Sequence, residues 1–388
     1  MSKGKRINGM NRRQFLKAGM VGATSAMLGA SVLTKASQEA AAAEPVAFPK
    51  PVYRTLGRTG LNISVVSFGA MLTPEPEVIK IALDHGVNYI DTARVYMGGK
   101  NEEIVGRAIK GRRQKLCVAT KTKSTTKDDI IKDVETSLKT LETDYIDVIQ
   151  LHSLVDKDRI FLPDAREALV TLKKQGKVRF FGVTTHKNQA DVLNALVDDK
   201  DRFFHTALVG YNFKTEKSVT EAIARAAKAN IGVIAMKTQA GGYVTQEMGL
   251  ISPHQAALKW VLQNRNITAA IPGMRDMAEL KEDIAVMGMP FQVADERILQ
   301  RYSAAIEPYY CTMCGQCEGT CPRGVEISTI NRSLMYAEGY RNPKLARSTY
   351  REATVSASAC LDCSVCVVRC VNGLNIAAKM AQARMMLA

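Results

Sequence analysis

The sequence predicts an α/β protein in which a (β/α)₈ barrel is followed by a mainly helical, cysteine-rich module. Three observations lead to this prediction. Apolar, strand-like runs recur along residues 64–271 in steps of 24 to 36 residues, which is enough for one strand, one helix and two loops. Patterns with helical spacing lie between these runs. Eight of the nine cysteines fall in two compact groups after residue 310.

Eight strand–helix units are expected in the barrel. The strands begin near Ser64, Asn88, Leu116, Tyr145, Val178, Thr206, Ile231 and Ile267. Residues 126–141 illustrate the helices, because apolar residues repeat there at helical spacing behind Thr126 and Asp129, which suit a capping box. Gly86 marks the end of an earlier helix. No short sequence repeat accompanies the units, which excludes a solenoid.

Length and composition limit the possible classes of protein. The chain has 388 residues, 46% of them apolar and 23% charged, which is ordinary for two or three globular domains. No uncharged apolar run of 18 or more residues occurs in the body, so we expect no membrane span there. The net charge is +15, but the basic pairs are scattered and no nucleic-acid-binding motif occurs. We expect a leader at 1–43, a barrel at 44–293 and the module at 294–388.

The leader holds seven basic residues and one acidic residue. Asn11-Arg12-Arg13-Gln14-Phe15-Leu16-Lys17 resembles a twin-arginine export signal, with Asn in place of the usual Ser or Thr. An apolar stretch over 18–33 and three alanines at 41–43 complete the pattern. The alternative is a random basic tail. The resemblance implies export of the folded protein by the twin-arginine translocase to the periplasm or the outer face of the cytoplasmic membrane.

Polar side chains stand where three successive strands end. The second strand ends at Asp91 with Tyr96 five residues later, the third at Lys121 and the fourth at His152. In a (β/α)₈ barrel these ends meet at one mouth. A lysine cation favours phenolate and is expected to lower the pKa of the tyrosine, which is about 10 in water. An acid, a phenol, an ammonium and an imidazole together suit protonation of a carbonyl oxygen.

On these residues, positions 53–284 resemble an aldo-keto reductase. Asp91, Tyr96, Lys121 and His152 match that family's catalytic tetrad one by one, and the segments 86–91 and 98–106 match the sequence around it. The resemblance implies that Tyr96 is the general acid/base, that Lys121 and Asp91 tune it, and that His152 orients the carbonyl of a small-molecule substrate.

The resemblance also implies NAD(P)H across the barrel mouth. The positions that correspond to its binding residues are Thr184, Thr185, Tyr211, Met236, Gly241, Gly242, Gly273, Met274, Arg275, Glu282 and Asp283. Several of them depart from the family pattern: Thr184-Thr185 stand for Ser-Asn, and Met236 for an aromatic residue. Glu279 stands where an arginine often holds a 2′-phosphate, which favours the unphosphorylated cofactor, although Arg275 is a substitute clamp.

The cysteines after residue 310 form two runs, the first of which is C-x₂-C-x₂-C-x₃-C-P. This resembles the bacterial ferredoxin pattern for [4Fe–4S] clusters, in which the fourth cysteine of each run ligates the other cluster. The resemblance implies one cluster on Cys311, Cys314, Cys317 and Cys370, and a second on Cys360, Cys363, Cys366 and Cys321. Zinc or disulfides are the alternatives. Helices are expected at 294–308, at 373–388 and between the runs, and Cys117 is interpreted as a buried core thiol.

Three hypotheses for function follow. The first is an iron–sulfur oxidoreductase that reduces a carbonyl or oxidises an alcohol and exchanges electrons with a redox partner protein. The second is an exported electron-transfer or binding protein that uses the barrel as a scaffold, without nicotinamide chemistry. The third is an ordinary reductase whose clusters are structural or sense oxidation. A hydride carries two electrons and a cluster accepts one, so no direct path between the two sites follows from the sequence.

Overall fold

The structure is a computed structural model that describes residues 48–388, and residues 47–388 form one compact unit. The predicted export signal and its alanine-rich end lie outside the described residues. Within residues 48–388, no helix is both long enough and apolar enough to cross a membrane.

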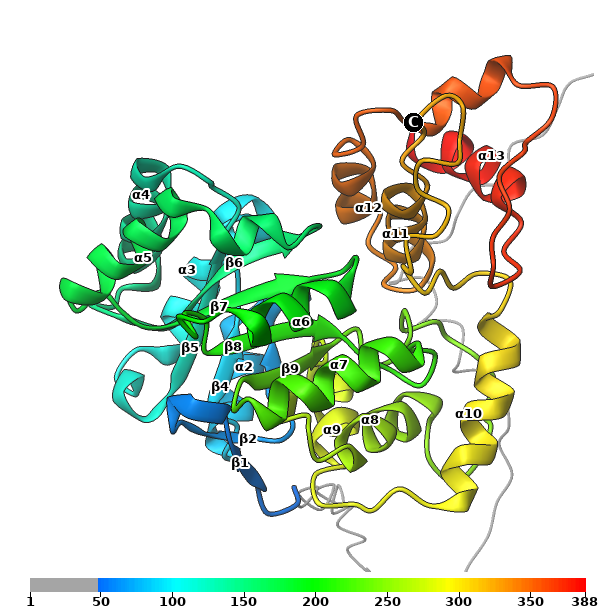
Figure 1. The fold of residues 1–388 in the computed structure, drawn as a ribbon. Helices are drawn as coiled ribbons and strands as arrows, with labels where there is room; N and C mark the ends of the chain where they lie inside the picture. Colours follow the sequence, from blue (N-terminus) through cyan, green and yellow to red (C-terminus); the bar gives the residue numbers. More distant parts are fainter. Residues whose placement is uncertain (1–47) are drawn as a thin grey trace, which may run out of the picture. The chain divides into compact units, whose positions relative to one another are not determined.

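Eight parallel strands form the central sheet, and their order in the sheet follows their order in the chain. Parallel bridges from Val66 to Ala270 and from Gly69 to Gly273 join its two edges, which closes the barrel (Figure 1). The predicted (β/α)₈ class is therefore confirmed. The strands are β3 (Phe68–Gly69), β4 (Tyr89–Asp91), β5 (Cys117–Thr122), β6 (Ile146–Leu154), β7 (Val178–Thr185), β8 (Thr206–Gly210), β9 (Gly232–Met236) and β10 (Ala269–Ala270).

One helix follows each strand. These helices are α2 (Pro76–Asp84), α3 (Lys100–Ile109), α4 (Lys127–Leu141), α5 (Pro163–Lys174), α6 (Gln189–Asp198), α7 (Lys217–Lys228), α8 (Pro253–Gln263) and α9 (Met277–Ile284). The Thr126 side chain accepts a hydrogen bond from the backbone N–H of Asp129 and caps α4, as predicted. Gly86 follows α2 with φ +87°, a conformation in which a Cβ would be strained.

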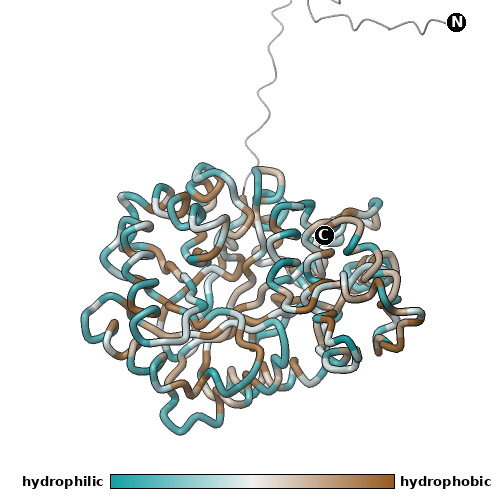
Figure 2. Tube along the Cα trace, turned by 90° about the horizontal axis from the view of Figure 1, so that it is seen from above, coloured by the Kyte–Doolittle hydropathy of each residue, from teal (hydrophilic) through white to brown (hydrophobic). Residues whose placement is uncertain are grey.

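Two apolar layers hold the barrel together. The larger lies between the strands and the surrounding helices, and the smaller fills the barrel interior, where Cys117 is 5% exposed. The prediction of a buried core thiol is thus confirmed. An antiparallel hairpin, β1 (Tyr53–Thr55) and β2 (Asn62–Ser64), precedes the barrel. In Figure 2, hydrophilic segments run along the outside of the molecule and apolar ones gather inside.

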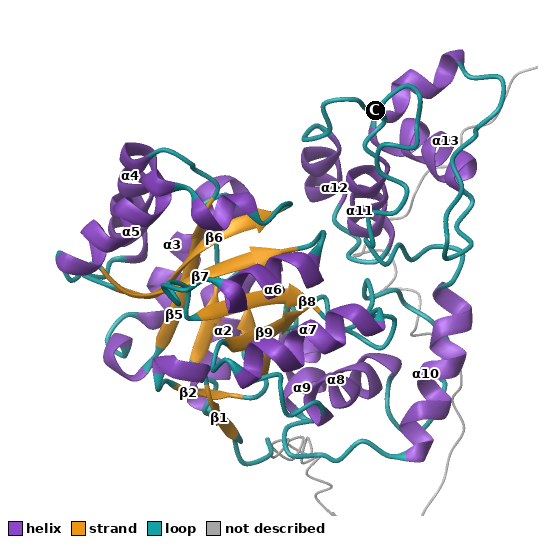
Figure 3. Cartoon of the chain, in the orientation of Figure 1, coloured by secondary structure: helices purple, strands orange, loops and turns teal. Residues whose placement is uncertain are grey.

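The chain after residue 292 contains helices and loops but no strand within the described part (Figure 3). The helices are α10 (Val293–Ile306), α11 (Ile327–Glu338), α12 (Pro343–Tyr350) and α13 (Ile376–Leu387). The helices expected at 294–308, between the cysteine runs and at 373–388 are confirmed. Their shared core includes Ala240 and Tyr243 from the loop after β9, so the module packs directly on the barrel.

Candidate active site at the barrel mouth

The four predicted tetrad residues come together at the carboxyl ends of neighbouring strands. Asp91 ends β4, Lys121 lies in β5 and His152 in β6, while Tyr96 begins the short 3₁₀ turn after β4. The Lys121 ammonium donates hydrogen bonds to Asp91 and, at 2.6 Å, to the carbonyl of Thr92. The Tyr96 ring centre lies 4.6 Å from Lys121 Nζ and 5.8 Å from the centre of the His152 ring.

Asp91 and Lys121 form a buried ion pair, with exposed fractions of 2% and 1%. The second carboxylate oxygen of Asp91 accepts a hydrogen bond from Gln150 Nε2 at 2.8 Å. Burial raises the pKa of Asp91 and lowers the pKa of Lys121, and the attraction between the two groups opposes both shifts. The lysine is therefore held in place by two oxygen partners, of which the Asp91 carboxylate is itself fixed by Gln150.

The expected effect of Lys121 on Tyr96 needs correction. The ammonium faces the tyrosine ring, and within residues 48–388 no hydrogen bond joins it to the hydroxyl. Burial, followed by the nearby Asp91 carboxylate, raises the pKa of Tyr96 well above its ordinary value. The reason is that Asp91 offsets the lysine charge, so desolvation outweighs it. Tyr96 is thus a neutral phenol, ready to donate rather than to accept a proton.

His152 is also neutral. Burial lowers its pKa well below the ordinary value, and the charges of Lys121, Lys123, Arg332 and Arg159 lower it further. Its Nδ1 atom is buried and has no hydrogen-bond partner among the described residues. A neutral imidazole with a free nitrogen can hydrogen-bond a carbonyl oxygen, as the tetrad assignment requires.

Sequence reasoning missed three residues at the mouth, which are Lys237, Tyr336 and Arg332. Lys237 directly follows β9, where the rule of functional strand ends would have found it. Its ammonium donates to the hydroxyl of Tyr336 on α11 at 3.2 Å. Burial raises the pKa of Tyr336, but Lys237 and Arg332 outweigh it, so the net pKa is lowered. No local signal marks Tyr336 or Arg332, because only the docking of α11 brings them to the barrel.

The backbone is strained around this mouth. Met97, Ser153, Asn188, Lys237 and Ala240 all have positive φ between 48° and 56°, and each lies in a segment at or after a strand end. Non-glycine residues in this region cost about 1–3 kcal/mol each and cluster at functional sites.

The residues assigned to NAD(P)H by resemblance lie in several parts of the barrel. The hydroxyls of Thr184 and Thr185 are buried and are used within the barrel, the first accepting from Ser153 N and the second donating to Leu154 O. Tyr211 and Met274 lie in the core between strands and helices, and Tyr211 packs on Trp260. The structure does not bring these two to the mouth. Met236 borders the barrel interior, and Gly273 pairs with Gly69.

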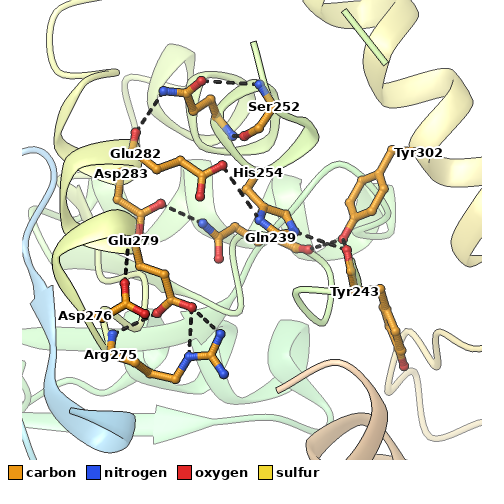
Figure 4. Close-up of polar contacts among 11 residues, drawn as sticks. Gln239, Tyr243, Ser252, His254, Arg275, Asp276, Glu279, Glu282, Asp283 and Tyr302 are labelled. Atoms are coloured by element: carbon orange, nitrogen blue, oxygen red, sulfur yellow. Dashed lines mark hydrogen bonds and ion pairs between the residues drawn. The ribbon is translucent and has the colours of Figure 1, made fainter. Parts of the chain in front are cut away.

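Arg275, Glu282 and Asp283 lie in the loop after β10 and in α9 (Figure 4). Arg275 is paired with Glu279, and its Nη1 donates to the carbonyl of Tyr340 at 3.0 Å. Asp283 is 1% exposed and accepts from Gln239 Nε2 at 2.7 Å, and Glu282 lies 4.0 Å from His254. The guanidinium expected to clamp a phosphate is thus already engaged.

The module covers the Gly241-Gly242 loop. A Cβ added to Gly241 would lie 3.2 Å from Met335, and one added to Gly242 would lie 3.7 Å from the Tyr340 ring. Gly339 approaches so closely that its own Cβ would lie 2.0 Å from the carbonyl oxygen of Gly241. The end of α11 therefore lies directly against this loop.

The structure brings cysteines of the two runs together at one cavity. One cavity is lined by Cys311, Cys314, Cys317 and Cys370, together with Ser328 and Asn331 of α11. Ser328 Oγ and both amide atoms of Asn331 are buried and lack hydrogen-bond partners within the described chain. Burial, then the neighbouring Cys321 and Cys363, raise the pKa of Cys360. Among the described residues, no three His, Cys, Asp or Glu side chains are placed to hold a single metal ion.

The fold and the mouth define a (β/α)₈ protein with a proton-transfer cluster at the carboxyl ends of its strands. Residues 74–250 match the model of the aldo/keto reductase family, so this part of the chain is an aldo/keto reductase domain. Proteins of this family are NAD(P)-dependent oxidoreductases.

Curated relatives agree with this assignment. The chain is 38% identical to the uncharacterized oxidoreductase YqkF of Bacillus subtilis over 34% of this chain and 48% of that protein. It is 33% identical to the aldo-keto reductase YhdN of the same organism over 46% of this chain and 59% of that protein. These two matches thus span about half the length of each relative. The uncharacterized oxidoreductase YrpG, also of B. subtilis, is 29% identical over 60% of this chain and 90% of its own length.

Solved structures show the same fold. The holo form of an aldo-keto reductase from Bacillus halodurans superposes with a TM-score of 0.56 at 23% identity, covering 65% of this chain and 96% of that one. An aldo-keto reductase from Klebsiella pneumoniae in complex with NADPH superposes with a TM-score of 0.56 at 24% identity, covering 65% and 95%.

Proposed function

We propose that this protein is an oxidoreductase that reduces a small-molecule carbonyl compound, or oxidises the corresponding alcohol, at the mouth of the barrel. We further propose that its C-terminal module carries two [4Fe–4S] clusters. The observation that carries the first proposal is the convergence of Asp91, Tyr96, Lys121 and His152 at one end of the strands.

In the reductive direction, the Tyr96 hydroxyl donates its proton to the carbonyl oxygen of the substrate. The phenolate that forms is stabilised by the Lys121 ammonium, 4.6 Å from the ring centre. Asp91 holds this lysine in position. His152, kept neutral by burial, donates a hydrogen bond to the same carbonyl oxygen and orients it.

The substitution Tyr96→Phe tests this role, because it removes the hydroxyl and keeps the ring over Lys121. We expect the rate of carbonyl reduction to fall about 10²- to 10⁴-fold, with iron content and visible absorbance unchanged. Tyr309→Phe, at a tyrosine that is 48% exposed, is the matched control. Equal activity in Tyr96→Phe and the native protein would overturn the assignment.

The two ends of the predicted NAD(P)H site differ in their fit to the cofactor. When bound, a nicotinamide supplies or accepts the hydride. The tetrad end is intact, but at the other end Arg275 is engaged and Met335 and Tyr340 cover the glycine loop. As arranged, this end does not fit a pyrophosphate, so we derive no step through the cofactor. The test is a titration with NADH and with NADPH, in which binding is measured by fluorescence. Saturable binding supports nicotinamide chemistry.

The donor set of the first cysteine cavity fits a cubane cluster. Each thiolate of a [4Fe–4S] cluster binds a different iron, so the ligands lie further apart than those of a single ion. Four cysteines around one cavity agree with this. The unpartnered Ser328 hydroxyl and Asn331 amide are suited to hydrogen-bond cluster sulfur. When bound, the clusters take up and release single electrons, which implies a redox partner protein.

Serine substitutions test the clusters and their cross-ligation. We expect Cys311→Ser and Cys370→Ser to remove the same cluster, which leaves about four irons of eight in each variant and identical spectra of the remaining cluster. Cys321→Ser is expected to remove the other one. Colourless, iron-free native protein after anaerobic preparation would contradict this proposal, and distinct spectra for the first two variants would contradict the cross-ligation.

We also propose export by the twin-arginine route, which carries folded proteins with inserted cofactors. The basis is the motif at 11–17. We expect replacement of Arg12 and Arg13 by lysine to retain the protein in the cytoplasm, as measured by fractionation. Unchanged export in this variant would refute the proposal.

A second function is favoured by one observation, the coverage of the Gly241-Gly242 loop by α11. It is an exported electron-transfer or binding protein that uses the barrel as a scaffold. No binding of NADH or NADPH, together with no effect of Tyr96→Phe, would favour this alternative over the enzyme.

A further inference from the structure

We propose that Lys237 and Arg332 form an anion-binding site at the barrel mouth that holds the carboxylate of an anionic carbonyl substrate, such as a 2-oxo acid. This inference rests on the proposed function and names its substrate class. The site joins the barrel and the module, because Lys237 follows β9 and Arg332 lies on α11.

Lys237 is a cation without a counter-ion. Its ammonium donates to the neutral hydroxyl of Tyr336, and across residues 48–388 no carboxylate lies within ion-pair distance of it. Its backbone has φ +55°, a strained conformation, and its carbonyl is held by Asn212 Nδ2 at 3.0 Å. Strain of this kind persists where the surroundings enforce a functional geometry. The chain therefore places this charge at the mouth and leaves it unpaired.

Arg332 supplies the second charge. Its side chain is 12% exposed, and its Nη2 lies 3.1 Å from Glu352. That carboxylate is shared, because Lys123 also lies 3.2 Å from it. The Nε of Arg332 is buried and lacks a partner within the described residues. One carboxylate between two cations leaves the mouth with an excess of positive charge, to which Lys237 adds.

Both charges meet at one face of α11, because Lys237 donates to Tyr336 and Arg332 precedes Tyr336 by one helical turn. In agreement with this placement, Lys237 and Arg332 each lower the pKa of His186, and Arg332 also lowers that of His152. The Nδ1 atoms of both histidines are buried without hydrogen-bond partners in the part of the chain described here. Such orphaned groups indicate a polar ligand that shares the mouth with them.

The chemistry of this set selects the ligand. Two cations and two neutral imidazoles suit an oxyanion, and charge-assisted hydrogen bonds to lysine and arginine are among the strongest that proteins form. A carboxylate held by Lys237 and Arg332, close to His152 and Tyr96, belongs to the molecule whose carbonyl reacts. A phosphate group of a cofactor has the same chemistry, so the experiment must separate the two sources.

The test compares benzoylformate with its uncharged methyl ester by isothermal titration calorimetry on the full-length, cluster-containing protein. The two probes share the keto group and differ in charge. We expect benzoylformate to bind about tenfold or more tightly than the ester. In Lys237→Met and Arg332→Met this preference should disappear, with ester binding unchanged. Lys177 lies at the opposite end of β7 and is paired with Glu135. The control Lys177→Met therefore removes one charge elsewhere and should keep the preference for benzoylformate.

The outcomes separate this inference from the proposed function. Equal binding of acid and ester to the native protein, no binding of either, or an equal loss in Lys177→Met would overturn the anion site. Weakened NADPH binding with unchanged benzoylformate binding in Lys237→Met would also overturn it, and would assign the charge to a cofactor phosphate. None of these depends on turnover, whereas the proposed function fails only if Tyr96→Phe keeps full activity. Thermal unfolding of each variant verifies folding. If Arg332→Met is unstable, Lys237→Gln takes its place as the second variant that removes a charge from the site.

Discussion

The backbone of Gly339 lies against the carbonyl of Gly241, so that a methyl group added to Gly339 would sit 2.0 Å from that oxygen. The end of α11 and the loop after β9 thus meet without an intervening side chain. This contact sets how far α11 reaches over the barrel mouth and brings Arg332 and Tyr336 to the site.

Gly339→Ala is expected to destabilise the protein by about 1–3 kcal/mol, because overpacking must push α11 away from the barrel. The loss arises even though Gly339 has φ −76°, a helical conformation in which alanine is favoured. Thermal unfolding measures the loss, and hydrogen exchange at Gly242 and Tyr340 should become faster. Gly249→Ala is the control, since its clash is only with the flexible end of Ile298. Equal effects of the two substitutions would argue against a rigid contact.

Asp91→Asn is expected to reduce the free energy of unfolding by about 3 kcal/mol, because it leaves the buried Lys121 charge unpaired. Glu142→Gln breaks the exposed pair with Lys110 and should cost less than about 1 kcal/mol. Denaturant unfolding compares the two. Adding Lys121→Met to Asp91→Asn should recover part of the loss, and a double variant less stable than Asp91→Asn would contradict this account.

Tyr336 should be among the first tyrosines to ionise, because Lys237 and Arg332 lower its pKa. Its folded pKa lies below its unfolded one, so the stability that it contributes is present above the unfolded pKa near 10 and is lost as pH falls through the folded pKa. Ultraviolet titration should show that Tyr336→Phe removes the earliest tyrosinate signal and that Lys237→Met delays it. An unchanged titration curve in both variants would refute the assignment.

His205 should make the protein sensitive to acid. Burial, with Lys173 and Arg58 nearby, lowers its pKa from 6.5 to about 4. Between these values the unfolded state binds more protons, so stability falls as pH drops from about 6.5 to about 4. His205→Gln should remove roughly 1 kcal/mol of this decline, allowing for partial exposure. Denaturant unfolding measures stability against pH. Equal slopes in His205→Gln and the native protein would contradict the role of His205.

Much of the barrel was predictable from local patterns. The expected strand starts differ from the observed ones by four residues or fewer, because each strand is a short apolar run with polar neighbours. Asp91, Lys121 and His152 could be found for the same reason, since a residue at a strand end must lie at the mouth once a barrel closes. The sign of the pKa shift of Tyr96 could not be predicted from the sequence, because it depends on how completely the Asp91 charge offsets that of Lys121.

The sequence alone determined the eight strand–helix units, the polar residues at the strand ends and the grouping of the cysteines, since each follows from spacing along the chain. Only the tertiary structure decided that Arg332 and Tyr336 join Lys237, that Arg275 donates to Tyr340 and that α11 covers Gly241. These relationships link positions 65 to 99 residues apart. They depend on which side chains face one another after docking, and that is decided by close packing of surfaces.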